Sequence, residues 1–301
     1  MERNRPPAEL GGRLLRVPPC RGTAAPAGGA IVAVAAEGMG SCAMDEFLLF
    51  VAVGFAAQLI DGAIGMAYGL SSTTILLNFG VPPATASASV HAAEVFTAGA
   101  SAVSHLHFRN VVGALFRPLA IAGMAGGAAG AWLLASTPAG IIRPVVSLYL
   151  LVMGALILLR VIRNRPRDPR ARPLQERPWL LAGYGAAGGF LDAVGGGGWG
   201  PMVTSTLIGS GVKARFAIGS SNAAEFFVAA VVSATFILTI GLELWPIITG
   251  LVIGGILAAP YGALAARHFP ERPLMAIVAI VIMLLSTRGL VLALGDLADA
   301  L

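Results

Sequence analysis

Long uncharged apolar runs recur along this chain from about residue 46 to residue 295. Many of these runs are long enough to cross the roughly 30 Å hydrocarbon core of a bilayer as a helix. A soluble domain carries roughly 25% charged residues, whereas 12% of this chain is charged and 56% is hydrophobic. The runs do not alternate with a period of two, which excludes a β-barrel. The sequence therefore predicts an all-α, polytopic helical membrane protein.

The basic residues gather in two clusters outside the apolar runs. Of the 20 basic residues, five lie in residues 1–22 and seven, all arginine, lie in residues 160–177. Both clusters are rich in proline and lack interleaved aromatic residues, so we expect no nucleic-acid partner. Because an excess of arginine resists translocation, we place the loop 163–177 in the cytoplasm.

The N-terminal residues 1–43 are rich in Arg, Pro, Gly and Ala. They make a poor signal peptide, because the charged lead is long and the apolar stretch 30–36 is brief. The chain enters a membrane helix directly after Met44, so we expect Met44 to be the biological start. In that case residues 1–43 are either untranslated or a disordered extension, and the mature protein lacks both Cys20 and Cys42.

The membrane part of the chain repeats itself with a shift of 131 residues, which aligns Asp61 with Asp192. Over residues 61–96 the shift gives 13 identities in 36 positions, too many for shared hydrophobicity alone. The sequence therefore predicts two homologous halves. The predicted organisation is an N-terminal extension 1–43, a first transmembrane repeat 44–162, an Arg-rich cytoplasmic loop 163–177 and a second transmembrane repeat 178–301.

Each half reads as five apolar segments, of which the first two are short and are divided by an Asp-Gly motif. These two segments form either one kinked crossing, giving about eight membrane segments in all, or a helical hairpin, giving about ten. The hairpin keeps Lys213 and the basic residues of 267–272 on the same side as the arginine loop, as the positive-inside rule requires. It also makes the halves inverted repeats, which is the arrangement that we favour.

The two Asp-Gly motifs are IDGAIGMAYGLSSTT at 60–74 and LDAVGGGGWGPMVTS at 191–205. Glycine lets the backbone leave helical geometry, and interrupted segments at matching places in two halves are typical of a transporter binding site. Backbone N–H groups freed at 62–66 and 193–200 would hold an anion without any arginine. The predicted substrate-binding residues are Asp61, Gly62, Gly65, Tyr68, Thr73, Asp192, Gly195, Gly196, Gly197, Gly198, Trp199 and Thr204.

Some of these side chains have an ordinary alternative role. Tyr68 and Trp199 either wall a substrate pocket or anchor their helices at the membrane interface. The hydroxyls of Thr73 and Thr204 either bind substrate or bond carbonyls of their own helices. The glycines of 123–131 and 254–263 have no polar neighbours and predict close helix packing instead of a site.

Four carboxylates lie deep in apolar sequence, namely Asp61, Asp192, Glu94 and Glu225. An ionised side chain at the bilayer centre costs at least about 2.5 kcal/mol, so each needs a partner, a proton or a wet cavity. We expect each aspartate either to cap a freed backbone N–H or to carry a proton.

One helix of each half pairs a carboxylate with a polar neighbour three residues earlier in the sequence. His91 is the neighbour of Glu94 in the first half, and Asn222 is the neighbour of Glu225 in the second. We predict a proton-coupling or polar-network role for these four residues, and a hydrogen-bonded strut remains the alternative. We predict no metal site, because His91 has no second His or Cys at ligand spacing.

The duplicated motif, together with SASVHAAE at 87–94 and SSNAAE at 220–225, resembles the sulfite exporter TauE/SafE family of membrane transporters. The resemblance covers about residues 46–290. It implies a carrier of the bacterial inner membrane that exports or takes up sulfur-containing or organic anions. Family members are usually drawn with about eight crossings, which agrees with the kinked crossing and not with the hairpin.

We therefore expect a secondary transporter that moves a small anion such as sulfite or a sulfonate, with the lipid bilayer and that anion as its partners and no cofactor. A homo-oligomer is compatible with the sequence. Two other functions stay open: an intramembrane hydrolase with paired aspartates and a passive anion channel. The chain carries neither a GxSxG nucleophile elbow nor a Walker A motif, so we expect neither an enzyme nor an ATP-driven pump.

Overall fold

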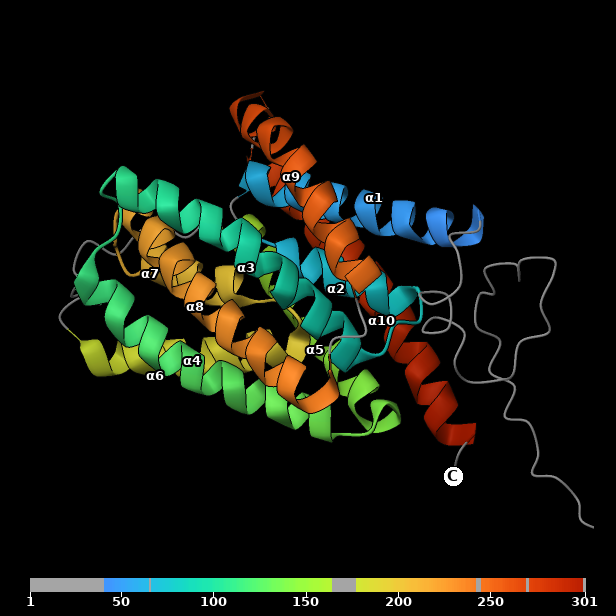
Figure 1. Ribbon diagram of the computed structural model, residues 1–301. Helices are drawn as coiled ribbons and strands as arrows, with labels where there is room; N and C mark the ends of the chain where they lie inside the picture. Colours follow the sequence, from blue (N-terminus) through green and yellow to red (C-terminus); the bar gives the residue numbers. More distant parts are fainter. Residues whose placement is uncertain (1–40, 65, 164–176, 242–244, 269–270, 300–301) are drawn as a thin grey trace, which may run out of the picture.

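The computed structural model describes residues 41–64, 66–163, 177–241, 245–268 and 271–299. These residues form helices and no strand (Figure 1), so the prediction of an all-α protein is confirmed. The first half contains α1 (Ser41–Ile64), α2 (Tyr68–Asn78), α3 (Pro83–His107), α4 (Gly113–Ser136) and α5 (Ala139–Arg163). The second contains α6 (Pro178–Gly195), the π-helical turn η3 (Gly200–Thr204), α7 (Ser205–Gly209), α8 (Ala214–Ile240), α9 (Trp245–His268) and α10 (Glu271–Asp299).

Four of the described helical stretches are long and apolar enough to cross a membrane. These are Gly113–Ser136, Ala139–Arg163, Ala214–Ile240 and Met275–Gly295. Large apolar side chains lie exposed along them, among them Trp132 and Leu284. Such a surface is unfavourable in water and suits lipid.

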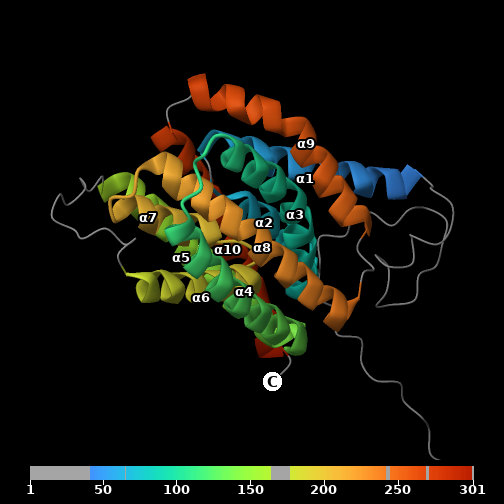
Figure 2. The same cartoon turned by 60° about the vertical axis from the view of Figure 1, so that its left-hand side comes forward.

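The elements of the two halves correspond in order under the 131-residue shift. The helix α1 matches α6, α2 matches η3 together with α7, and α3, α4 and α5 match α8, α9 and α10. The halves do not fold as separate bundles. Instead α1 packs on α9, α4 packs on α6 and α8, and α5 packs on α10, so that each half completes the other (Figures 1 and 2).

Two pairs of matched helices run antiparallel. In the pair α3 and α8, Ala88 and Phe236 line one small cavity, whereas Ser101 near the other end accepts a hydrogen bond from Asn222. In the pair α5 and α10, Ser147 lies beside Gly289. Further along α5, Gly154 lies beside Ala279, which comes earlier in α10.

Two unmatched pairs run parallel and are held together by glycine. A methyl group on Gly126 of α4 would collide with the carbonyl of Ala186 in α6, and one on Gly254 of α9 would collide with that of Val51 in α1. The expectation that the glycine runs of α4 and α9 serve close packing is therefore confirmed at these two positions, where only glycine permits the approach of the backbones.

The helix directions fix the path of the short segments. The start of α8 lies beside the start of α4, since Ser220 accepts a hydrogen bond of 2.9 Å from the N–H of Val112. The start of α6 lies at this same end, because Gly185 packs on Leu119. The chain thus enters the bundle with α6, turns inside it and comes back to the same end. This is the path of the hairpin and not of a single kinked crossing.

Candidate functional site

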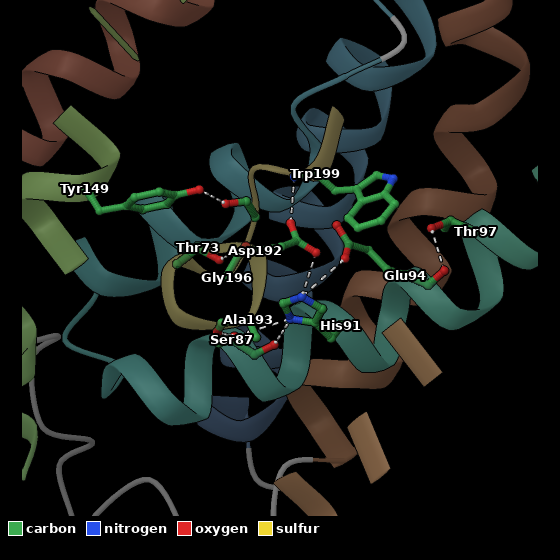
Figure 3. A network of polar contacts seen from close by, with 11 residues as sticks. Thr73, Ser87, His91, Glu94, Thr97, Tyr149, Asp192, Ala193, Gly196 and Trp199 are labelled. Atoms are coloured by element: carbon green, nitrogen blue, oxygen red, sulfur yellow. Dashed lines mark hydrogen bonds and ion pairs between the residues drawn. The ribbon is translucent and has the colours of Figure 1, made fainter. Parts of the chain in front are cut away.

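The two interrupted segments meet inside the bundle. One break lies between α1 and α2, and the other lies between α6 and η3. The hydroxyl of Thr73 in α2 donates a hydrogen bond to the carbonyl of Gly196 in the second break (Figure 3). A methyl group on Gly69 would collide with the Cα of Gly197, so the two backbones are in direct contact.

The two breaks differ in their backbone geometry. In the second break Gly196, Gly197 and Gly198 have φ angles of 66°, 152° and 140°. Side chains are strained in this region of φ, so the glycine run is what allows the turn. In the first break Ala67 has a φ of 118°. The first break therefore has a different backbone conformation from the second, although the repeat relates the two segments.

Each aspartate reaches across its break to the start of the next helical element. The N–H of Trp199 donates to Asp192 Oδ1 at 2.8 Å, and the N–H of Tyr68 donates to Asp61 Oδ1 at 3.3 Å. Of the two roles predicted for the aspartates, the capping role is therefore present. A carboxylate also suits the positive end of a helix dipole.

The position of the aspartates differs from the prediction. Both lie within helices, because α1 extends to Ile64 and α6 extends to Gly195. The backbone at 62–64 and at 193–195 is thus helical, and the breaks come several residues after each acid. Each aspartate still caps the next helical element, because its side chain reaches across the break. Gly62 belongs to α1, while Gly65 lies outside the described residues.

Several of the N–H groups predicted to meet an anion are bonded within the protein. The N–H groups of Gly196 and Gly197 donate to the carbonyl of Asp192, and the N–H of Trp199 donates to its carboxylate. The carbonyls of the break are engaged as well, since Gly196 accepts from Thr73. In this conformation the second break is closed by its own hydrogen bonds.

A buried histidine faces the carboxylate of Asp192. His91 in α3 is fully buried, and its Nε2 lies 3.2 Å from Asp192 Oδ2 and 4.0 Å from Glu94 Oε2. Its Nδ1 lies 2.8 Å from the carbonyl oxygen of Ser87. A carbonyl oxygen only accepts, so Nδ1 carries a proton. A proton on either Nε2 or the Asp192 carboxyl makes this contact a hydrogen bond, whereas without one two acceptors would face each other.

The three charged groups form one compact cluster. One ligand atom from each of His91, Glu94 and Asp192 lies within 4.8 Å of the others. Glu94 Oε2 makes no hydrogen bond among the described residues. This spacing suits a shared positive charge, which a proton or a small cation supplies. The two carboxylates complete a three-residue set with His91, although no second His or Cys stands at ligand spacing in the sequence.

The pairing inside this cluster differs from the predicted one. Asp192, which is 101 residues away in sequence, lies closer to His91 than Glu94 does. Asn222 does not serve Glu225 but donates to Ser101 Oγ at 2.8 Å. The predicted contact of His91 with Glu94 is present at 4.0 Å, beside the shorter one with Asp192, whereas Asn222 contacts α3 instead of its neighbour on α8.

The two aromatic residues after the breaks are part of the core. Trp199 is fully buried, and its indole N–H lies 3.0 Å from Ser221 Oγ. Tyr68 is buried, and its hydroxyl donates to the carbonyl of Leu251 at 3.4 Å. Anchoring at a membrane interface is therefore wrong for both. Thr204 likewise bonds Ser221 at 2.6 Å and not a carbonyl of its own helix.

One residue of the site had no signal in the sequence. Tyr149 of α5 donates to the carbonyl of Gly197 at 2.9 Å (Figure 3). Methyl groups on Gly195 or Gly198 would collide with the side chain of Tyr149, so it covers the glycine run. It lies in an apolar helix, and the residue that corresponds to it in the other half is Ile280.

A helical bundle of two interleaved repeats, with paired interrupted segments around buried charges, is the architecture of a multi-pass membrane transporter. The model of the sulfite exporter TauE/SafE family matches residues 50–289, and the chain belongs to that family. It is similar to the probable membrane transporter protein YtnM of Bacillus subtilis (strain 168), with 39% identity over 253 residues, which cover 82% of this chain and 84% of that protein. No solved structure matches the chain.

Proposed function

We propose that this protein is a secondary transporter of the bacterial inner membrane that moves a small sulfur-containing or organic anion, such as sulfite or a sulfonate. The substrate passes where the two interrupted segments meet. The observation that carries the proposal is the direct contact of Gly69 with Gly197 beside a buried charged cluster. Two broken segments from two halves are what a transporter needs in order to bind a substrate at mid-membrane.

We further propose that the halves are inverted in the membrane. The antiparallel directions of α3 with α8 and of α5 with α10 support this arrangement. If the arginine loop 163–177 is cytoplasmic, then α6 and α8 start on the cytoplasmic side. The exposed Lys213, directly before α8, then lies on that side as well. The positive-inside rule is then obeyed in both halves. The hairpins accordingly enter the membrane from opposite sides.

The carboxylates of the charged cluster would repel a transported anion. Glu94 and Asp192 lie in one buried cluster, and like charges repel strongly where water is excluded. An anion reaches the glycine run only if protons offset these charges. We propose that His91, which faces Asp192 and Glu94, holds one such proton. The anion and the proton therefore cross together.

Transport requires the two segments to separate. Gly69 and Gly197 touch, and hydrogen bonds from Tyr149 and Thr73 hold the second break closed. Moving α2 away from this break opens a space between the segments and frees the carbonyl of Gly196, while the carbonyl of Gly197 stays bonded to Tyr149 of α5. The N–H groups that donate to Asp192 become available only if the break itself rearranges. We propose this closed arrangement as an occluded state.

Purified protein in liposomes tests the proposal. We expect sulfite to accumulate above its external concentration when a pH gradient, acidic on the side of entry, is imposed. The uptake should fall when a protonophore removes the gradient. Flux that only equilibrates sulfite would support the channel alternative instead. Release of a cleaved product without net transport would support the hydrolase alternative.

A further inference from the structure

A second polar site lies away from the charged cluster, where the end of α2 meets α5 and α10. A small cavity there is lined by the polar residues Thr74, Asn78, Arg143, Ser147 and Ser286. Its described lining contains no carboxylate. Of the residues that line the cavity, only Thr74 belongs to one of the interrupted motifs.

Two arginines bring positive charge to this place. Arg288 of α10 donates to Asn78 Oδ1 at 2.8 Å, and Arg143 of α5 lies 3.5 Å from the carbonyl oxygen of Leu77. Asn78 is held in turn, because its amide donates to the carbonyls of Thr74 and Leu285. The guanidinium groups therefore converge on the last turn of α2 from two different helices.

Two hydroxyl groups at the cavity have no partner among the described residues. Thr74 and Ser286 are 1% and 2% exposed, and neither Thr74 Oγ1 nor Ser286 Oγ makes a hydrogen bond. A buried hydroxyl without a partner is unfavourable, and native structures contain few of them. Both groups can donate to a water or to a ligand that accepts hydrogen bonds, and both lie in a cavity that Arg143 also lines.

Packing symmetry does not explain these residues. Under the 131-residue shift, Arg143 corresponds to Leu274 and Ser147 to Val278, while Arg288 corresponds to Ile157 and Ser286 to Ala155. The matched place in the other half is therefore largely apolar. Since the fold supports one junction without these polar groups, it does not need them at the other.

We propose that this cavity binds the transported oxyanion at one end of its path. Arginine is the residue that best recognises oxyanions, through paired charge-assisted hydrogen bonds, and the hydroxyls of Thr74 and Ser286 supply two further donors. Thr74 is adjacent to Thr73, which bonds the second break. The site lies near the start of α5, at the opposite end of that helix from Arg163, and its role as an entry or exit station rests on the transport function proposed above.

Sulfite binding to the purified full-length protein tests this site, measured by calorimetry with potassium chloride as a control for ionic strength. Arg288→Gln should weaken sulfite binding by about tenfold, the size expected for a charge-assisted hydrogen bond. Arg163→Gln, an exposed arginine at the other end of α5, should leave the affinity unchanged. Equal affinity in wild type and Arg288→Gln would overturn the site.

Ser286→Ala provides a second test of the site if an arginine variant fails to fold. Removing an unpartnered hydroxyl should leave the unliganded Tm unchanged or higher, while the stabilisation by sulfite becomes smaller. A lower unliganded Tm with undiminished stabilisation by sulfite would assign the hydroxyl to the fold and overturn the site.

The transport proposal and the site fail in different ways. If wild-type protein binds sulfite through Arg288 but does not transport it, the transport proposal fails and the site stands. If the protein transports sulfite and Arg288→Gln binds and transports it normally, the site fails and the transport proposal stands.

Discussion

The backbone N–H of Trp199 donates a 2.8 Å hydrogen bond to the carboxylate of Asp192, seven residues earlier in the chain. Tyr68 and Asp61 stand in the same relation with the same offset of seven residues, at 3.3 Å. The lone aspartate in each apolar run therefore caps the helical element that follows the break. At Asp192 the other oxygen remains for His91.

Substitutions of Asp192 should separate its capping role from its charge. Asp192→Asn keeps an oxygen that accepts from Trp199 N–H, so we expect a thermal stability near that of wild type but impaired transport. Asp192→Ala removes the cap and should cost a further 0.5–2 kcal/mol or so, the usual effect of losing an N-cap. Thermal unfolding in detergent and liposome uptake measure the two effects. Equal destabilisation by both substitutions would show that the charge, and not the cap, stabilises the segment.

The pH dependence of transport should depend on His91. The groups that face His91 are Asp192 and Glu94, so removing the imidazole leaves two carboxylates close together without a neighbouring N–H donor, and uptake should fall. His91→Asn copies the residue that the other half carries at Asn222 and should flatten the profile. An unchanged profile in this variant would place the coupling elsewhere.

The contact between Gly195 and Tyr149 should be sensitive to a single methyl group. Gly195→Ala places that group inside the ring of Tyr149, so we expect lower stability and loss of transport. Gly209→Ala is a matched control at the end of α7, because no atom lies within 4 Å of the added carbon. Combining Gly195→Ala with Tyr149→Ala should restore part of the stability, a coupling that a double-mutant cycle measures. Additive effects of the two changes would contradict the proposed collision.

The glycines of α4 and α6 should differ according to what faces them. Gly126→Ala meets the backbone of Ala186 and should reduce the yield of folded protein. Gly183→Ala in α6 has no atom within 4 Å and should be neutral, or stabilising by up to about 1 kcal/mol, because alanine is the better helix former. Size-exclusion chromatography and thermal unfolding distinguish the two. Similar yields for both variants would mean that α4 and α6 are less tightly packed than the structure indicates.

The orientation in the membrane can be tested by labelling single cysteines in a variant without Cys20 and Cys42. A cysteine at Lys213 should resist a membrane-impermeant maleimide in intact cells, and so should one at position 170, which lies outside the described residues. A cysteine at Gly140, exposed at the opposite end of the bundle, should react. Labelling at 213 but not at 170 would contradict the inverted arrangement.

Much of the architecture follows from local properties of the sequence. Hydropathy along the chain predicts membrane helices because the bilayer acts on each helix separately. The 131-residue repeat predicts matched elements, and the glycine runs predict where the helices break. The sequence predicts that Asp61 and Asp192 either cap freed N–H groups or carry a proton, because an acid in the bilayer needs a partner or a proton. Each of these inferences needs only neighbouring residues.

Other features depend on helices that come together from distant parts of the chain. The sequence paired His91 with Glu94, but packing of α3 against α6 brings Asp192 closer. Nothing in the local sequence of Tyr149 or Arg288 indicates their contacts. In the fold Tyr149 contacts the glycine run and Arg288 contacts the end of α2. The membrane-helical class, the two halves and the broken segments follow from the sequence, because hydropathy and glycine act locally. Which charges face one another follows only from the packed fold, because it depends on the direction and rotation of each helix against its neighbours.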